Sequence, residues 1–191
     1  DDVVIIVGYM KDKLKDFVDD HYGDRFRVSY VEQARRLGLG HAILTGREAV
    51  VDDPVLITLG DEVFGIGFDE MVRIHGELGD CAGSLGVKKV DNPSSYGIVE
   101  LDGDRITRLI EKPKDPASNT AIAGVYIIND TPTLWKALEA MVGERSAALE
   151  TSVRGANGCV IPRGAEIQLT DALQRMVGSG HILRSFPLEE W

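Results

Sequence analysis

The sequence is poor in cysteine: its 191 residues include only Cys81 and Cys159. The two lie far apart, and neither has a histidine or another cysteine nearby at the spacing of zinc ligands. A zinc site is therefore a poor hypothesis. We expect both residues to be reduced thiols of a cytoplasmic protein.

Long apolar runs and an excess of positive charge are also missing. No stretch approaches the roughly 20 apolar residues that a transmembrane helix needs. The chain has 31 acidic and 21 basic residues and a net charge of −10, whereas proteins that bind the nucleic-acid backbone carry basic surfaces. We expect neither a membrane nor a nucleic acid as partner, although a few local cations can still hold a small anionic ligand.

The motifs of two common reaction classes are absent as well. There is no G-x-x-x-x-G-K-[ST] loop, which excludes a P-loop NTPase. The histidines form no i, i+4 pair, and Ser94-Ser95 lack the context of a nucleophile elbow. A hydrolytic triad is therefore a poor hypothesis.

Apolar and polar residues alternate in patterns that predict strands and helices in turn. The length suits one well-cored domain, and no repeat or linker divides it, so we expect a single domain over residues 1–191. The βαβα order of the first half implies an α/β fold, with a mostly parallel sheet and helices on both faces. Asp102-Gly103 predicts a hairpin turn. The expected strands cover residues 3–7, 26–30, 55–59, 82–90, 98–101, 105–110, 121–128 and 182–188, and the expected helices include 11–20, 68–78 and 166–177.

Residues 55–62 read Val-Leu-Ile-Thr-Leu-Gly-Asp-Glu, an apolar run that ends at a glycine and two carboxylates. Such a run is typical of a buried strand in a parallel sheet, and ligands of these sheets bind at the carboxyl ends of the strands. Asp61 at that edge can hold Mg²⁺ through its oxygens. It can equally open a turn or cap the next segment.

Other polar residues follow predicted strands. Gln33 carries a donor and an acceptor, which suits the edge of a nucleobase. Gly38 and Gly40 would let a base or phosphate approach the backbone at a helix start, or they form a flexible loop. Glu111 and Lys112 suit a sugar phosphate, with a solvated charge pair as the alternative.

Two later positions add to this set. Gly124 weakens an apolar strand unless something approaches it closely. Glu166 and Asp171 lie on the last predicted helix, but five residues apart they do not share one face.

The order of these motifs resembles that of the sugar-1-phosphate nucleotidylyltransferases, and most of all the glucose-1-phosphate uridylyl- and thymidylyltransferases. The similarity runs through nearly the whole chain. The motifs that carry it are Glu32-Gln33, Gly38-Leu39-Gly40-His41-Ala42, Leu59-Gly60-Asp61, Tyr96-Gly97, Glu111-Lys112-Pro113, Ala123-Gly124-Val125-Tyr126 and Glu166-Ile-Gln-Leu-Thr-Asp171.

The resemblance implies a Rossmann-like nucleotidyltransferase fold and a reaction of a nucleoside triphosphate with a sugar 1-phosphate, with Mg²⁺ as cofactor. It suggests UTP or dTTP and a hexose 1-phosphate such as glucose 1-phosphate, and it leaves the base, the sugar and a homo-oligomeric state open. The implied catalytic residues are Asp61, as metal ligand, and Lys112, at the sugar phosphate. The implied binding residues are Gln33, Gly38 and Gly40 for the nucleotide, and Tyr96, Gly97, Glu111, Gly124 and Glu166 for the sugar.

The chain departs from the family pattern at both ends. The family begins with a glycine-rich G-x-G-T-R segment and a Pro-Lys pair, and it has a second metal-binding aspartate near the last strand. Residues 1–191 contain neither, so we expect that the first βα unit and a C-terminal segment are missing and that this polypeptide alone has little or no transferase activity. The alternative is a non-catalytic relative that binds sugar nucleotides or regulates a partner.

Overall fold

The computed structural model describes residues 2–152 and 166–191. The chain divides into two compact units. The first contains Asp1–Val51 and Leu138–Leu169, and the second contains Asp52–Ala137 and Thr170–Trp191. Cys81 is a buried thiol in no disulfide, whereas Cys159 lies outside the described residues.

The first unit begins with a βαβ arrangement. Strand β1 (Asp2–Val7) pairs in parallel with β2 (Arg27–Glu32), and helix α1 (Lys11–Tyr22) connects them. Parallel pairing needs such a crossover, so the predicted strand, helix and strand at the start of the chain are confirmed. Gln33 follows β2 directly, and its backbone N–H donates to the carbonyl oxygen of Val7 at 2.9 Å.

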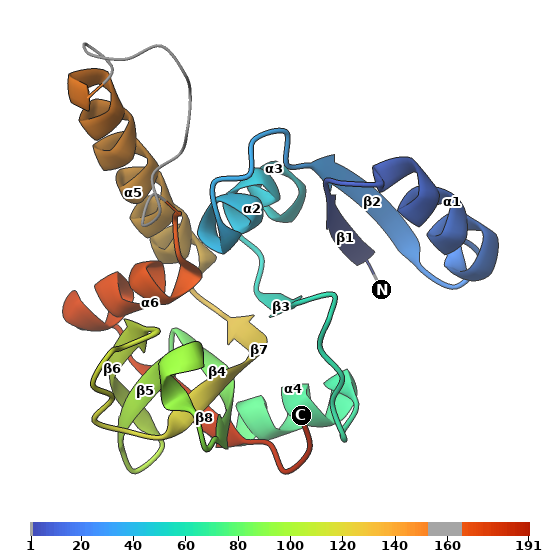
Figure 1. The fold of residues 1–191 in the computed structure, drawn as a ribbon. Coiled ribbons are helices and arrows are strands. Elements are labelled where there is room, and N and C mark those ends of the chain that lie inside the picture. Colours follow the sequence, from blue (N-terminus) through green and yellow to red (C-terminus); the bar gives the residue numbers. More distant parts are fainter. Residues whose placement is uncertain (1, 153–165) are drawn as a thin grey trace. The chain divides into compact units, whose positions relative to one another are not determined.

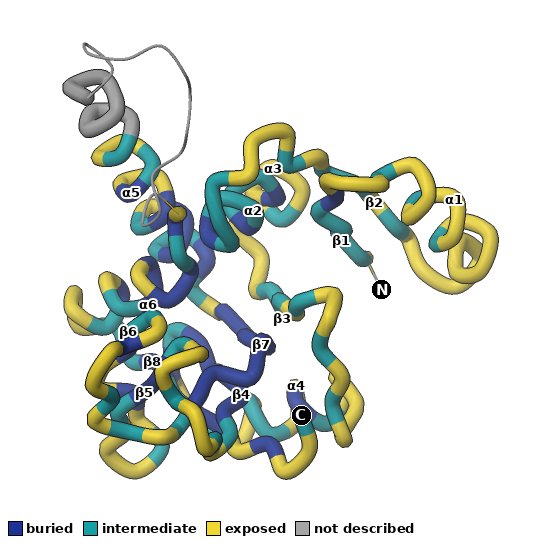
Figure 2. Tube along the Cα trace, viewed as in Figure 1, coloured by how far each residue is buried: buried dark blue, intermediate teal, exposed yellow. Residues whose placement is uncertain are grey.

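The helices of the first unit differ in how much they bury. No residue of α1 is buried, as the teal and yellow tube of this helix in Figure 2 shows. Helix α2 (Leu39–Thr45) buries Gly40 and Ile43, and the short α3 (Arg47–Val50) follows it. An ion pair from Arg47 to Glu139 joins α3 to the part of α5 (Thr131–Ser152) that belongs to the first unit.

The second unit contains a mixed sheet with the described strand order β3-β7-β4-β8-β6-β5 (Figure 1). The strands are β3 (Val55–Thr58), β4 (Gly83–Lys89), β5 (Gly97–Asp102), β6 (Arg105–Glu111), β7 (Thr120–Ile128) and β8 (Leu183–Pro187). A further pair, Ile98 with Ala121, links β5 back to β7, so that β7, β4, β8, β6 and β5 pair in a ring and β3 pairs with β7 outside it.

The expectation of a mostly parallel sheet is wrong for this unit. Among its described strands only β4 and β8 pair in parallel, and the other pairs are antiparallel. For β5 and β6 the cause is local, because a two-residue loop can join only antiparallel strands. The loop residues of the β5–β6 hairpin are Gly103 and Asp104, one position later than predicted, and Gly103 adopts the positive φ of 63° that this turn requires.

Strand β3 also differs from the expectation. It has four residues, pairs antiparallel with β7 alone among the described strands, and is only half-buried, with Thr58 exposed. The deeply buried strand is instead β7, in which all residues from Ala121 to Ile128 are buried, so both faces of this strand are covered (Figure 2).

One hydrophobic cluster joins the sheet to α4 (Phe68–Glu77). Met71 of α4 packs with alternate residues of β7 and with the β8 segment, and Trp191 lies against the same cluster. Period-two burial in a strand and burial of a single helical face explain how these elements meet. The buried members of the cluster are Met71, Ala123, Val125, Ile127, Phe186 and Leu188.

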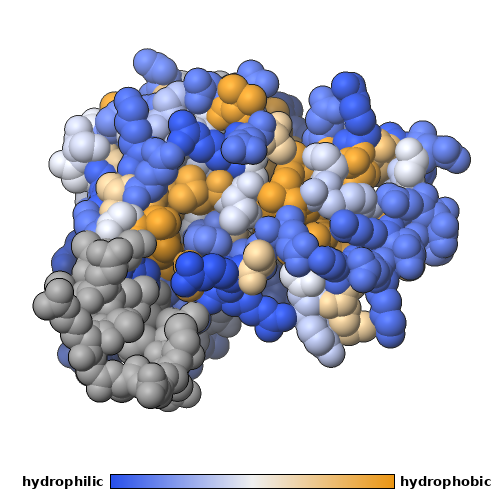
Figure 3. Space-filling model, turned by 90° about the horizontal axis from the view of Figure 1, so that it is seen from above, coloured by the Kyte–Doolittle hydropathy of each residue, from blue (hydrophilic) through white to orange (hydrophobic). Residues whose placement is uncertain are grey.

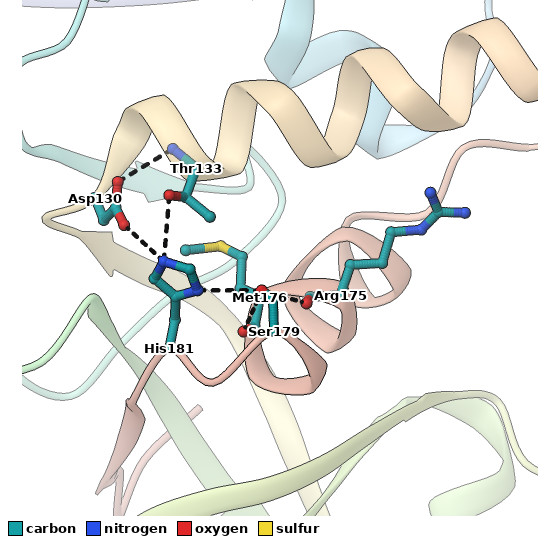
Figure 4. Close-up of polar contacts among 6 residues, drawn as sticks. All are labelled: Asp130, Thr133, Arg175, Met176, Ser179 and His181. Carbon is teal, nitrogen blue, oxygen red and sulfur yellow. Dashed lines mark hydrogen bonds and ion pairs between the residues drawn. The ribbon is translucent and has the colours of Figure 1, made fainter.

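Polar contacts hold helix ends within the second unit. Asp130 caps α5 by accepting a hydrogen bond of 3.1 Å from the backbone N–H of Thr133, and an aspartate at this position is a common helix cap. His181 contacts Asp130 through Nε2 at 3.4 Å and Ser179 through Nδ1 at 3.1 Å (Figure 4). His181 therefore joins the start of α5 to the end of α6 (Leu169–Gly178).

The surface of the protein is mostly hydrophilic on the face that Figure 3 shows. On the face shown in Figure 3, hydrophilic side chains predominate and hydrophobic ones form patches between them, in agreement with the acidic composition. None of the described helices combines the length and apolar character needed to cross a bilayer.

Candidate functional site

The predicted nucleotide residues lie in the first unit. Gln33 donates through Nε2 to the carbonyl oxygen of Gly38 at 3.1 Å, and the same nitrogen lies 3.1 Å from Nδ1 of His41. Burial and the nearby Arg35 charge lower the pKa of His41, which favours the neutral ring whose Nδ1 accepts a hydrogen bond. Both amide hydrogens of Gln33 are then used, and its Oε1 makes no hydrogen bond to a described residue.

Gly38 and Gly40 lie against residues 166 and 167. Gly38 has a φ of 100°, and a Cβ placed there would lie 2.8 Å from the backbone N and O of Ile167. The backbone N–H of Gly40 donates to the carbonyl oxygen of Ile167 at 2.8 Å. The two glycines therefore permit a close backbone approach within the unit. Their role in holding a nucleotide stays a prediction.

This approach also explains why the last helix begins later than expected. Helix α6 begins at Leu169, whereas the sequence pattern predicts a start at Glu166. The backbone of Ile167 is occupied by hydrogen bonds with Leu37 and Gly40, so it cannot form the first helical turn. Glu166 is exposed, and its carboxylate accepts a hydrogen bond of 3.0 Å from Gln168.

The second unit brings together most of the predicted sugar residues. The hydroxyl of Thr170 donates to Oε2 of Glu111 at 2.7 Å. A Cβ on Gly97 would lie 3.0 Å from Oγ1 of Thr170 and 3.1 Å from Oε2 of Glu111, so the missing side chain keeps this carboxylate accessible. Sequence reasoning missed Thr170, although it lies beside Asp171 in a motif that we had singled out.

Lys112 follows Glu111 with an unusual backbone conformation. Its φ is 40°, which is uncommon for a residue with a side chain and is often found at functional sites. The backbone N–H of Lys112 donates to the carbonyl oxygen of Tyr96 at 3.0 Å. The Lys112 side chain is 64% exposed, and its ammonium lies 3.9 Å from Oε1 of Glu111, so it stays available to an anionic ligand.

Gly124 occupies an irregular position in β7. The register with β4 shifts between Leu85 and Val87, and Gly124 has a φ of 70°. A Cβ there would lie 2.8 Å from Cγ of Glu62. The close approach expected at this glycine is therefore made by a side chain of the protein, Glu62, which the sequence pattern did not single out.

Glu62 and Trp191 form a second polar contact in this unit. The indole N–H of Trp191 donates to Oε2 of Glu62, and the Trp191 ring meets that of Tyr96 edge-on with centroids 5.3 Å apart. Tyr126 is 4% exposed, and burial together with the charges of Glu111 and Glu62 raises its pKa, so its hydroxyl remains protonated.

Asp61 stands apart from these contacts. It is exposed and makes no hydrogen bond or ion pair with a described residue. The described residues contain no group of three histidine, cysteine or acidic side chains that could hold a metal. Mg²⁺ commonly takes one or two carboxylates and completes its shell with water and substrate phosphates, so a single free carboxylate fits this ion.

Comparisons with known proteins agree with this architecture. The family profile described as Nucleotidyl transferase matches residues 1–152. A UDP-glucose pyrophosphorylase structure, solved with UDP-glucose, matches with a TM-score of 0.73 and 24% identity over 100% of this chain and 75% of its own, which shows a shared fold.

Curated relatives cover nearly all of this chain. A glucose-1-phosphate thymidylyltransferase of Streptomyces antibioticus is 32% identical over 98% of this chain and 48% of its own length. A low-salt glycan biosynthesis nucleotidyltransferase of Haloferax volcanii is 29% identical over 100% of this chain and 48% of its own. The chain thus spans about half the length of these relatives. Because the family profile covers most of the chain, this protein belongs to the nucleotidyl transferase family.

Proposed function

We propose that this protein transfers a nucleotidyl group from UTP or dTTP to a hexose 1-phosphate, with glucose 1-phosphate as the preferred acceptor. The products are a nucleotide sugar and pyrophosphate. Family membership and the names of the relatives support the reaction class, and because the chain spans about half of those relatives, the activity is proposed for the whole protein.

The observation that carries the proposal is the grouping of Glu111, Thr170 and Lys112 in the second unit. The Glu111 carboxylate accepts hydrogen bonds, and Thr170 fixes one of its oxygens. The exposed Lys112 ammonium next to it is suited to a phosphate. Together they offer an acceptor for sugar hydroxyls and a cation for the sugar phosphate, and Gly97 leaves space beside them.

The base preference is proposed from Gln33. Its amide hydrogens go to Gly38 and His41, so Oε1 is left as an acceptor for a ligand. Uracil and thymine present a ring N–H donor to such an acceptor, whereas the equivalent ring nitrogen of cytosine is itself an acceptor. Among the pyrimidines, Gln33 therefore favours uracil and thymine and does not discriminate between them.

In the proposed reaction an oxygen of the sugar phosphate attacks the α-phosphorus, and the bond to the leaving pyrophosphate breaks with its electron pair. Such transfers depend on positioning and charge neutralisation more than on proton transfer. Lys112 offsets the charge of the attacking phosphate, and Glu111 orients the ring. Asp61 would hold Mg²⁺, which supplies charge neutralisation at the phosphates when bound.

A pyrophosphate-release panel on the full-length protein tests the proposal. UTP, dTTP, CTP, ATP and GTP are each combined with several hexose 1-phosphates in the presence of Mg²⁺. We expect release with UTP or dTTP and a hexose 1-phosphate. Binding of a sugar nucleotide without release from any pair would instead support the non-catalytic alternative.

A further inference from the structure

The loop that follows β3 is tethered to the end of the described chain. The backbone N–H of Gly65 donates to the carbonyl oxygen of Glu190 at 3.2 Å, and the Trp191 indole donates to Glu62. Trp191 itself packs against the cluster around Met71. Glu62 is therefore held by a side chain that is anchored in the hydrophobic core of the second unit.

This anchoring leaves one oxygen of Glu62 for a ligand. Oε2 accepts from Trp191, whereas Oε1 lies toward the place where Gly124 has no side chain, at 3.0 Å from a Cβ built there. No described residue donates a hydrogen bond to Oε1. A carboxylate whose position is fixed and that has an unused acceptor oxygen loses little conformational entropy when it binds a hydrogen-bond donor.

Glu62, Glu111 and Tyr126 lie in the same electrostatic environment of the second unit. The Trp191 indole donates to Glu62 and its ring meets that of Tyr96, which precedes the Gly97 that lies beside Glu111. Burial and the charges of both carboxylates raise the pKa of Tyr126, whose hydroxyl makes no hydrogen bond to a described residue. The three groups offer acceptors from two anions and a donor from one neutral phenol. A neutral sugar ring matches this set, because each of its hydroxyls both donates and accepts.

We propose that Glu62, positioned by Trp191, is a specificity residue that makes the sugar site accept neutral hexose 1-phosphates and reject those that carry a ring carboxylate. The inference rests on the proposed function. A uronic acid 1-phosphate would place a third carboxylate beside Glu62 and Glu111. Repulsion between like charges at close range would strongly weaken the binding of this acceptor. Lys112 does not offset this repulsion, because it is assigned to the phosphate.

The test compares glucose 1-phosphate with glucuronic acid 1-phosphate on the full-length protein by steady-state pyrophosphate release. The ratio of the two kcat/KM values is measured in wild type, Glu62→Gln and Trp191→Phe. Gln is nearly isosteric with Glu and can still accept from the Trp191 indole, so the fold should be kept. Glu77→Gln is the matched control, because Glu77 is an exposed carboxylate on α4 of the same unit.

We expect wild type to prefer glucose 1-phosphate and Glu62→Gln to reduce this preference by roughly tenfold. Trp191→Phe should raise the KM for glucose 1-phosphate several-fold and leave the KM for the triphosphate unchanged, and Glu77→Gln should match wild type. If both proteins turn over and the ratio of the two kcat/KM values is the same in wild type and Glu62→Gln, this inference is wrong and the proposed function stands. Absence of turnover with every acceptor overturns the proposed function and this inference with it.

Discussion

The Thr170 hydroxyl donates a hydrogen bond of 2.7 Å to Oε2 of Glu111, across 59 positions of sequence. Glu111 ends strand β6 and Thr170 lies at the start of helix α6. The contact holds a carboxylate that is otherwise free to rotate, next to a glycine that leaves it accessible. A fixed acceptor loses less conformational entropy when it binds a ligand than a mobile one does.

Thr170→Val tests this contact. Valine has the same shape but no hydroxyl, so Glu111 loses its donor, and we expect the free energy of unfolding to fall by about 1 kcal/mol. The KM for the sugar 1-phosphate should rise several-fold and that for the triphosphate should not change. Chemical denaturation and pyrophosphate-release kinetics measure the two effects. Thr107→Val, which removes an exposed hydroxyl bound to a backbone carbonyl, is the control.

Gly124→Ala tests the irregular position in β7. The φ of 70° is strained for alanine, and its Cβ would lie 2.8 Å from Cγ of Glu62. We expect the unfolding free energy to drop by roughly 1 to 3 kcal/mol and sugar-phosphate binding to weaken as Glu62 is displaced. Gly76→Ala, at an open position on α4, should be neutral or slightly stabilising. Equal effects of both substitutions would contradict the role given to Gly124.

Because the His41 ring is neutral in the folded protein, we expect the free energy of unfolding to depend on pH. Its pKa is lowered in the folded protein, so below the ordinary value of 6.5 the unfolded chain binds the proton more readily. Stability should therefore be complete above pH 6.5 and decline as the pH falls from 6.5 toward the lowered value. His41→Gln removes this titration, and denaturation curves collected between pH 5 and 8 should show a smaller decline in the variant. An identical pH profile would rule out His41 as the source.

Asp61→Ala tests the metal assignment. Because Asp61 is exposed and makes no hydrogen bond or ion pair with a described residue, we expect an unchanged melting temperature and a loss of Mg²⁺-dependent turnover by about a hundredfold or more. Asp53→Ala, at an exposed position before β3, is the matched control and should keep wild-type activity. An active Asp61→Ala variant would show that this carboxylate does not hold the metal.

Much of the architecture follows from local pattern. The strands and helices at residues 3–7, 11–20, 121–128 and 182–188 are confirmed to within a few residues, because apolar periodicity reflects which face of an element is buried. The cap at Asp130 and the hairpin near Gly103 follow from the chemistry of single residues. The directions of the strands did not follow, because apolar runs look alike in parallel and antiparallel sheets.

In the candidate site too, some residues could be predicted from the sequence and others could not. The sequence by itself determined the order of motifs that led to the family. It singled out Glu111 and Lys112 as polar residues after a predicted strand and Gly124 as a glycine within an apolar strand, whereas Gly97 followed only from the resemblance. Only the tertiary structure revealed Thr170, Glu62 and Trp191. Glu62 and Trp191 are 129 positions apart, and packing of the chain end on the α4 cluster decides that they meet. Local periodicity carries no information about such distant pairs, because their distance depends on how whole elements pack.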